Sequence, residues 1–163
     1  ARRYLDILAG AYMIRVLPPW FENISKRQVK SPKTYVRDSG IFHGLLQLDS
    51  LPQLQSHPKL GASWEGFVIE QLIGLLATRD AYFWATHGGA ELDLLVRVRG
   101  KNYGFEIKYA DAPGASRSMR VALDDLGLEH LWVVYPGQHE YALDERISAL
   151  PVHSLPNLAA GLR

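Results

Sequence analysis

The chain has 163 residues, enough for one well-filled core or for a small N-terminal module attached to a domain of about 100 residues, and we favour the second arrangement. Its composition, 47% hydrophobic and 21% charged, fits neither a disordered nor a membrane class. The lack of cysteine excludes disulfides and thiolate zinc sites and is compatible with the reducing cytoplasm, where we expect the protein to work. With 18 basic and 17 acidic residues the formal net charge is +1, so any DNA contact must come from local patches.

The first third of the chain predicts a small module of alternating helices and strands. In chain order we expect a helix at 2–9 capped by Gly10, strands at 12–17 and 33–37, and a helix from the Asp38 cap through Leu46. Residues 52–58 contain two prolines and indicate a linker. The order of elements resembles part of a winged helix, and we assign residues 1–55 to this module. The chain does not begin with Met, and we expect it to be a fragment of a longer protein.

Residues 56–163 predict an α/β domain. The expected helices cover 61–78 and 116–126, and the expected strands cover 81–86, 92–99, 102–109 and 130–135. The second helix has the length of a crossover that joins two parallel strands. We further expect edge strands at 140–143 and 147–152 and a closing helix near Leu158, with no transmembrane segment anywhere.

Two acids and a lysine are expected to meet on the hairpin of the second and third strands. Side chains alternate along a strand, so Glu106 and Lys108 point the same way, and Asp93 points away from an apolar face made by Leu92, Leu94, Val96 and Val98. If Gly100-Lys101 is a two-residue turn, Arg99 pairs with Asn102, Leu95 faces Glu106 and Asp93 faces Lys108. A three-residue loop would send Asp93 to the opposite face, whereas a glycine in the first turn position favours the short loop.

Converging carboxylates indicate a metal site, because they repel one another unless a cation lies between them. Oxygen ligands suit Mg²⁺ or Mn²⁺, and Asp93, Glu106 and the Ile107 carbonyl could hold such an ion. The metal could orient and deprotonate a water for attack on a phosphodiester, while Lys108 stabilises charge on the attacking or departing oxygen. The alternative is a solvated hairpin in which Asp93 and Lys108 form a cross-strand ion pair worth roughly 0.2 to 1 kcal/mol.

Glu65 is the fourth candidate. It lies early in the helix at 61–78, bordering its apolar face, and could lean over the site. Alternatively, it could stabilise the positive end of the helix without any catalytic role.

An acid on a helix, an Asp at the start of a strand and Glu-x-Lys on its hairpin partner resemble the PD-(D/E)xK nuclease superfamily. Glu65, Asp93, Glu106 and Lys108 match the motif positions, although Leu92 stands where the motif's name has proline. The resemblance implies a restriction-endonuclease-like fold, a mixed sheet flanked by helices, and a catalytic role for these four residues.

A second resemblance covers nearly the whole chain. The segments that carry it are Arg3-Tyr4-Leu5-Asp6, Leu17-Pro18-Pro19-Trp20, Lys30-Ser31-Pro32-Lys33, Asp38-Ser39-Gly40 and Trp64-Glu65-Gly66-Phe67. They are similar to the C-terminal region, a domain of unknown function, of a family of prokaryotic AAA-type ATPases. The resemblance implies an upstream ATPase module as partner. The chain itself contains no Gly-x-x-x-x-Gly-Lys-[Ser/Thr] phosphate loop, so we do not expect it to bind ATP in that way.

DNA contacts are expected from Arg97, Arg99 and Lys101 beside the site. A basic segment near the N-terminus could follow a phosphate backbone or could equally dock the ATPase; its basic residues are Lys26, Arg27, Lys30, Lys33 and Arg37, with Tyr35 and Trp20 nearby for stacking. The six histidines show no paired metal-ligand spacing. The sequence therefore predicts a divalent-metal-dependent nuclease domain acting on DNA as the C-terminal part of an AAA-type ATPase. The alternative is a nuclease-fold module of that ATPase that docks or regulates without cleaving.

Overall fold

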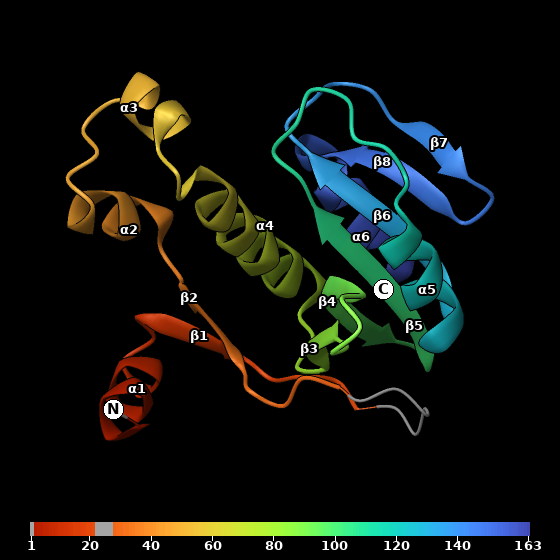
Figure 1. Cartoon of the computed structure of the whole chain (residues 1–163), viewed down its shortest axis with the longest axis horizontal. Coiled ribbons are helices and arrows are strands. Elements are labelled where there is room, and N and C mark those ends of the chain that lie inside the picture. Colours follow the sequence, from red (N-terminus) through yellow and green to blue (C-terminus); the bar gives the residue numbers. More distant parts are fainter. Residues whose placement is uncertain (1, 22–27) are drawn as a thin grey trace.

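The computed structural model describes residues 2–21 and 28–163 and gives them a mixed α/β fold (Figure 1). The N-terminal elements are α1 (Arg2–Gly10), β1 (Ile14–Leu17), β2 (Lys33–Val36), α2 (Ser39–Leu45) and α3 (Leu51–Ser56). The later elements are α4 (Leu60–Leu76), β3 (Ala81–Ala85), β4 (Glu91–Val98), β5 (Lys101–Ile107), α5 (Arg117–Asp125), β6 (Leu128–Tyr135), β7 (Tyr141–Asp144), β8 (Ile147–Pro151), the 3-10 turn η1 (Val152–Ser154) and α6 (Leu155–Leu162).

The strands form two sheets. β1 and β2 pair antiparallel in a small sheet of their own, and the other strands form a six-stranded sheet in the order β3-β4-β5-β6-β8-β7. β3, β4 and β5 are antiparallel neighbours, whereas β5, β6 and β8 run parallel. The connection from β5 to β6 passes through α5, which confirms the predicted crossover helix.

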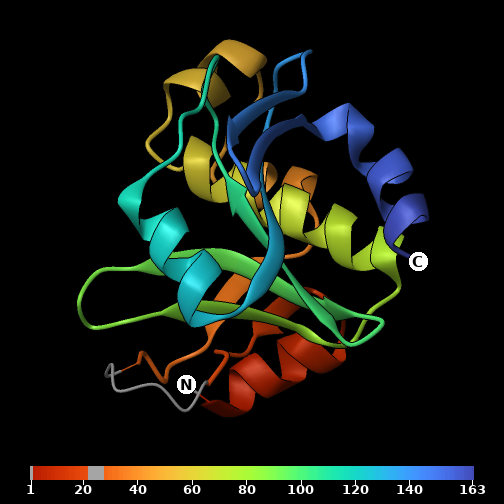
Figure 2. The same cartoon turned by 90° about the vertical axis from the view of Figure 1, so that its right-hand side faces the viewer.

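Helices cover both faces of the large sheet, with α4 and α6 on one face and α5 on the other (Figure 2). On the first face α4 buries Val68, Ile69 and Leu72, and on the second face α5 buries Met119, Ala122 and Leu123. Strands buried on both faces read as continuous apolar runs, which explains the sequence of β6 (LEHLWVVY). No helix in the described residues is long and apolar enough to cross a bilayer.

Three local predictions are wrong. The expected linker at 52–58 is largely the helix α3, because Pro52 lies in the first turn, where a missing N–H costs nothing. The strand β8 was expected at an edge but lies between β6 and β7. Gly10 ends α1 without a left-handed conformation, and Tyr12 adopts the positive φ of 59° instead.

The N-terminal segment lies along the edge strand β3. Trp20 N–H donates to the Phe83 carbonyl at 2.7 Å, and Val29 N–H donates to the Ala85 carbonyl at 2.9 Å. These bonds cover an edge that would otherwise expose unpaired backbone groups. They also bring the small sheet next to α4, where Leu17 is 1% exposed within the main core.

Candidate functional site

The hairpin that carries the predicted site has a two-residue turn, one position earlier than predicted. Val98 pairs with Lys101, so the turn consists of Arg99 and Gly100, whose φ values are 50° and 78°. Two consecutive positive φ values are typical of a type I′ turn, whose twist suits a hairpin. The short loop is confirmed, but the residues that form it are not those predicted.

The register of the two strands changes accordingly. Leu95 pairs with Gly104, so the predicted pairings of Leu95 with Glu106 and of Asp93 with Lys108 are wrong. Moving the turn by one residue moves each partner by two positions, which leaves every side chain on the same face. Asp93 therefore comes next to Glu106 rather than next to Lys108.

A β-bulge in β4 lies at the first carboxylate. Asp93 and Leu94 lie opposite the single residue Phe83 of β3, because the register shifts by one between the two flanking pairs. Those pairs are Tyr82 with Leu95 and Trp84 with Leu92. Bulges re-aim side chains and are frequent beside active sites, and this one interrupts the alternation of β4 at Asp93.

The bulge also changes which apolar residues share a face. Leu92 and Leu95 pack in the core beneath α5, whereas Leu94 and Val96 pack in the core beneath α4. The predicted common face of Leu92, Leu94, Val96 and Val98 is therefore wrong for Leu92.

Asp93 and Glu106 are buried carboxylates, 5% and 4% exposed. The Ile107 N–H donates to Asp93 Oδ2 at 2.9 Å, and Lys108 Nζ lies 2.7 Å from Glu106 Oε1. The second Glu106 oxygen, Oε2, is buried and has no hydrogen-bond partner. Buried polar atoms are nearly always bonded, so this oxygen marks a position where a further ligand can bind.

Glu65 reaches the same cluster from α4. Its Oε1 accepts hydrogen bonds from Tyr35 Oη at 2.6 Å and from Lys33 Nζ at 3.1 Å, and Lys33 Nζ also lies 3.4 Å from Asp93 Oδ1. Burial and the Glu65 charge raise the pKa of Tyr35, so its hydroxyl remains a donor. The first turn of α4 holds no acidic residue, and the predicted alternative role of Glu65 at the helix end is therefore wrong.

The ionisable groups of the cluster perturb one another. Burial, followed by the charges of Glu106 and Glu65, raises the pKa of Asp93 to about 7. Burial likewise raises the pKa of Glu106. Burial alone would lower the pKa of Lys33 and Lys108, but their carboxylate partners raise it, so both remain ammonium ions. Perturbed groups gathered in this way are typical of functional sites.

A metal ion would have to use mixed oxygen ligands. Within residues 2–21 and 28–163, acids, histidines and cysteines form no group of three or more that could hold an ion by themselves. Asp93, Glu106 and the Ile107 carbonyl are oxygen donors of the kind that Mg²⁺ and Mn²⁺ prefer. The buried Glu106 Oε2 without a partner fits such an ion, since a carboxylate oxygen is satisfied by metal coordination as by a hydrogen bond.

The basic residues predicted to contact DNA beside the site lie in or close to the turn of the hairpin. The Arg97 guanidinium is 5.8 Å from the centre of the Trp20 ring. Arg99 is six positions beyond Asp93 along the hairpin, roughly 20 Å at the rise of an extended strand. Lys101 follows the turn and pairs with an exposed glutamate at 3.3 Å.

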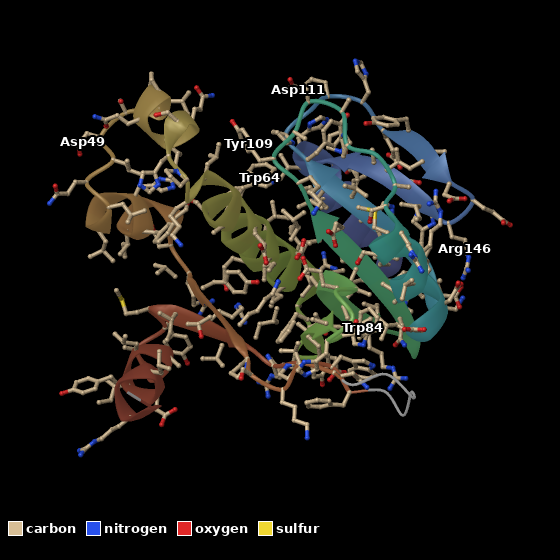
Figure 3. All side chains as sticks on the ribbon, viewed as in Figure 1. Asp49, Trp64, Trp84, Tyr109, Asp111 and Arg146 are labelled. Atoms are coloured by element: carbon tan, nitrogen blue, oxygen red, sulfur yellow. The ribbon has the colours of Figure 1, made fainter. Side chains whose placement is uncertain are left out.

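Lys33 and Tyr35 are the site residues that sequence reasoning did not place at the carboxylates. Both were assigned only to a basic surface at the N-terminus, together with Lys26 and Arg27, which lie outside the described residues. Positions i and i+2 of a strand share a face, so the spacing of Lys33 and Tyr35 could have indicated that they act together. Trp64 and Tyr109, the neighbours of Glu65 and Lys108, meet edge to face at 5.7 Å (Figure 3).

Two family models match the chain. The model described as "Domain of unknown function (DUF4143)" matches residues 60–155 and so includes the hairpin and α4. The model described as "Domain of unknown function (DUF8612)" matches residues 1–51 and so includes Lys33 and Tyr35. The predicted boundary after residue 55 falls between the two matches, and the division into domains stays a prediction.

Similar proteins occur in mycobacteria. "Uncharacterized protein Rv2008c" of Mycobacterium tuberculosis and "Uncharacterized protein Mb2031c" of Mycobacterium bovis are each 54% identical over 155 residues, which is 95% of this chain and 35% of each relative. The chain thus spans about a third of the length of these relatives. Protein VC1899 from Vibrio cholerae is a similar solved structure with a TM-score of 0.39, 15% identity and coverage of 99% of this chain and 41% of that one.

Proposed function

Since the chain belongs to the family described as Domain of unknown function (DUF4143), whose description names no activity, we propose a function from the site itself: a divalent-metal-dependent nuclease-like domain that acts on DNA phosphodiesters. The observation that carries the proposal is the pair of buried carboxylates, Asp93 and Glu106, with one Glu106 oxygen lacking a partner. The fold proposed with it is restriction-endonuclease-like, as the resemblance to the PD-(D/E)xK superfamily implies.

Asp93, Glu106 and the Ile107 carbonyl would hold the ion. In a β-strand the N–H and the C=O of one residue both point toward the same adjacent strand. The Ile107 N–H donates to Asp93 Oδ2, so we expect the Ile107 carbonyl to face Asp93 as well. A bound Mg²⁺ or Mn²⁺ supplies charge stabilisation and an activated water at neutral pH.

Lys108 is the cation placed to meet a phosphate. Its ammonium is fixed by Glu106 Oε1 at 2.7 Å, while its side chain is 45% exposed and so remains accessible to a substrate. A fixed positive charge beside the reacting phosphate stabilises the negative charge that develops in the transition state. Glu65 accepts a hydrogen bond from the other lysine of the cluster, Lys33, and so orients its ammonium.

We propose that the domain works within a longer protein that contains an AAA-type ATPase. The support is the resemblance of the chain to the C-terminal region of such ATPases, together with the length of the mycobacterial relatives, of which this chain matches 35%. Control by nucleotide hydrolysis would then come from outside the residues described here.

The second candidate is a module of the same fold that docks or regulates without cleaving. The observation that favours it is the Lys33 ammonium, which bonds to Glu65 and lies 3.4 Å from Asp93 Oδ1, so it can neutralise the cluster without any metal.

Calorimetric titration of MgCl₂ and MnCl₂ into the chain and into Asp93→Ala tests the metal site, and assays on supercoiled, linear and single-stranded DNA test cleavage. We expect metal binding that the substitution abolishes, together with metal-dependent cleavage. Binding that ignores the substitution would refute the site. Binding without cleavage, in this chain and in the full-length protein, would favour the second candidate.

A further inference from the structure

Lys33 occupies the position beside the carboxylates where a cation is needed. Its Nζ lies 3.1 Å from Glu65 Oε1, 3.4 Å from Asp93 Oδ1 and 5.6 Å from the centre of the Phe83 ring. The residue comes from β2, in the segment matched by a different family model from the one that covers the carboxylates. The cation beside the carboxylates therefore comes from outside the segment, residues 60–155, that the DUF4143 model matches.

A second ionic contact fixes the small sheet of β1 and β2 along α4. Glu70, five positions after Glu65, accepts a hydrogen bond from Arg37 Nε at 3.0 Å and pairs with Arg15. One arginine comes from β1 and the other directly follows β2. The small sheet of β1 and β2 is thus held at two points on one helix.

We propose that Lys33, carried by β2, is an internal counter-cation that competes with the divalent metal for Asp93 and so lowers the metal affinity of the site. The inference rests on the proposed metal site and identifies a residue that limits its affinity for the metal. The Lys33 ammonium lies against Glu65 and Asp93, so a divalent ion that binds Asp93 has to displace it.

The oxygen geometry explains why the two cations exclude each other. Asp93 Oδ2 already accepts the Ile107 N–H, so Oδ1 is the oxygen left for a metal. Lys33 Nζ lies 3.4 Å from that same oxygen. A divalent ion on Oδ1 would face an ammonium ion a few ångströms away, and like charges at that distance repel strongly in a partly buried site.

The burial of Lys33 distinguishes it from a residue that contacts substrate. Its side chain is 30% exposed and is engaged by two carboxylates and an aromatic ring, whereas Lys108 is 45% exposed and bonded to one carboxylate. Lys108 is therefore the lysine that can reach a phosphate, and Lys33 acts on the carboxylates.

The test is calorimetric titration of MnCl₂ alone into wild-type protein, Lys33→Met, Lys33→Arg and Tyr35→Phe. Lys33→Met is expected to bind Mn²⁺ at least about tenfold more tightly, because one unit charge beside the ion is worth more than that even at an effective dielectric of about 20. Lys33→Arg keeps the charge and should match the wild type. Tyr35→Phe removes a neutral hydrogen bond to Glu65, which Lys33 also contacts, and should stay within about threefold of wild type.

Thermal unfolding gives a second readout that does not depend on cleavage. Mn²⁺ should raise the Tm of Lys33→Met more than that of the wild type, because tighter binding stabilises the folded state further. Unchanged or weaker Mn²⁺ binding in Lys33→Met, with normal binding by the wild type, would overturn the competition and leave the metal site intact. No Mn²⁺ binding by either protein would overturn the competition and the proposed function together.

Discussion

Replacement of Asp93 by asparagine is expected to stabilise the metal-free protein at pH 8. Burial and the charges of Glu106 and Glu65 raise the pKa of Asp93 from 3.8 to about 7. A shift of about three pKa units corresponds to about 4 kcal/mol of unfavourable free energy in the ionised form, which is the upper limit of the gain. Asparagine can turn its one carbonyl oxygen toward either Ile107 N–H or Lys33, but not both, so we expect about 2 kcal/mol to remain.

The sign of the pH dependence follows from linkage. The unfolded chain ionises Asp93 near pH 3.8, while the folded protein keeps it protonated up to about pH 7. The contribution of Asp93 to the free energy of unfolding is therefore most favourable below about pH 4 and is lost as the pH rises to about 7. The Asp93→Asn variant lacks this loss, so its advantage should be small near pH 4 and complete above pH 7.

Urea denaturation in EDTA, followed by tryptophan fluorescence between pH 5 and pH 8, measures this difference. Asp111→Asn, at an exposed position, is the matched control and should leave the free energy of unfolding unchanged. With Mn²⁺ in place of EDTA the wild type should become the more stable of the two, because it binds the ion and the variant has lost a carboxylate that holds it. A variant less stable than the wild type at pH 8 in EDTA, or an advantage equal at pH 5 and pH 8, would refute the reasoning.

Three further outcomes are expected. Lys108→Met should lower DNA cleavage by about 100-fold, measured on plasmid substrate, because its ammonium, held by Glu106, is the positive charge placed to stabilise the phosphate in the transition state. Glu70→Gln should cost about 1 to 2 kcal/mol in urea denaturation and speed proteolysis of the N-terminal segment, since it breaks the contact with two arginines. Gly104→Ala should cost about 1 to 3 kcal/mol in thermal denaturation, because its Cβ would lie 2.6 Å from Leu128 Cδ1 in the core.

The hairpin was predictable from the sequence to within one turn position. Gly100 satisfies either the first position of a type II′ turn or the second position of a type I′ turn, and the sequence alone favours neither. The structure uses the second, which requires a positive φ of 50° at Arg99, an uncommon conformation for a residue with a side chain. The two choices differ by two positions in register, so the error moves the expected neighbour of Asp93 from Lys108 to Glu106.

The bulge at Asp93 was not predictable in the same way. It exists because β3 and β4 pair with different registers on either side of Phe83, and this mismatch depends on two strands that the sequence connects through a separate turn. A strict period of two therefore assigned Leu92 to the wrong face, although every strand of the large sheet was found near its observed place. Periodicity finds strands, but irregularities between strands require the tertiary structure.

The position of Lys33 beside Asp93 could not be predicted from the sequence, and it bears on both candidate functions. It meets Asp93 across 60 positions of the chain, and no local pattern marks such a contact. When Asp93 is ionised, above about pH 7, Glu65, Asp93 and Glu106 carry three negative charges against the two positive charges of Lys33 and Lys108, so the cluster attracts a further cation whether or not the domain cleaves. The preference of Asp93 Oδ1 for a divalent ion over the Lys33 ammonium therefore decides whether the cluster holds a metal, and cleavage by the metal-bound protein distinguishes the nuclease from the non-cleaving module. If Lys33 stays in place under all conditions, the site is a structural ion cluster; if a divalent ion can displace it, the same carboxylates become a metal site.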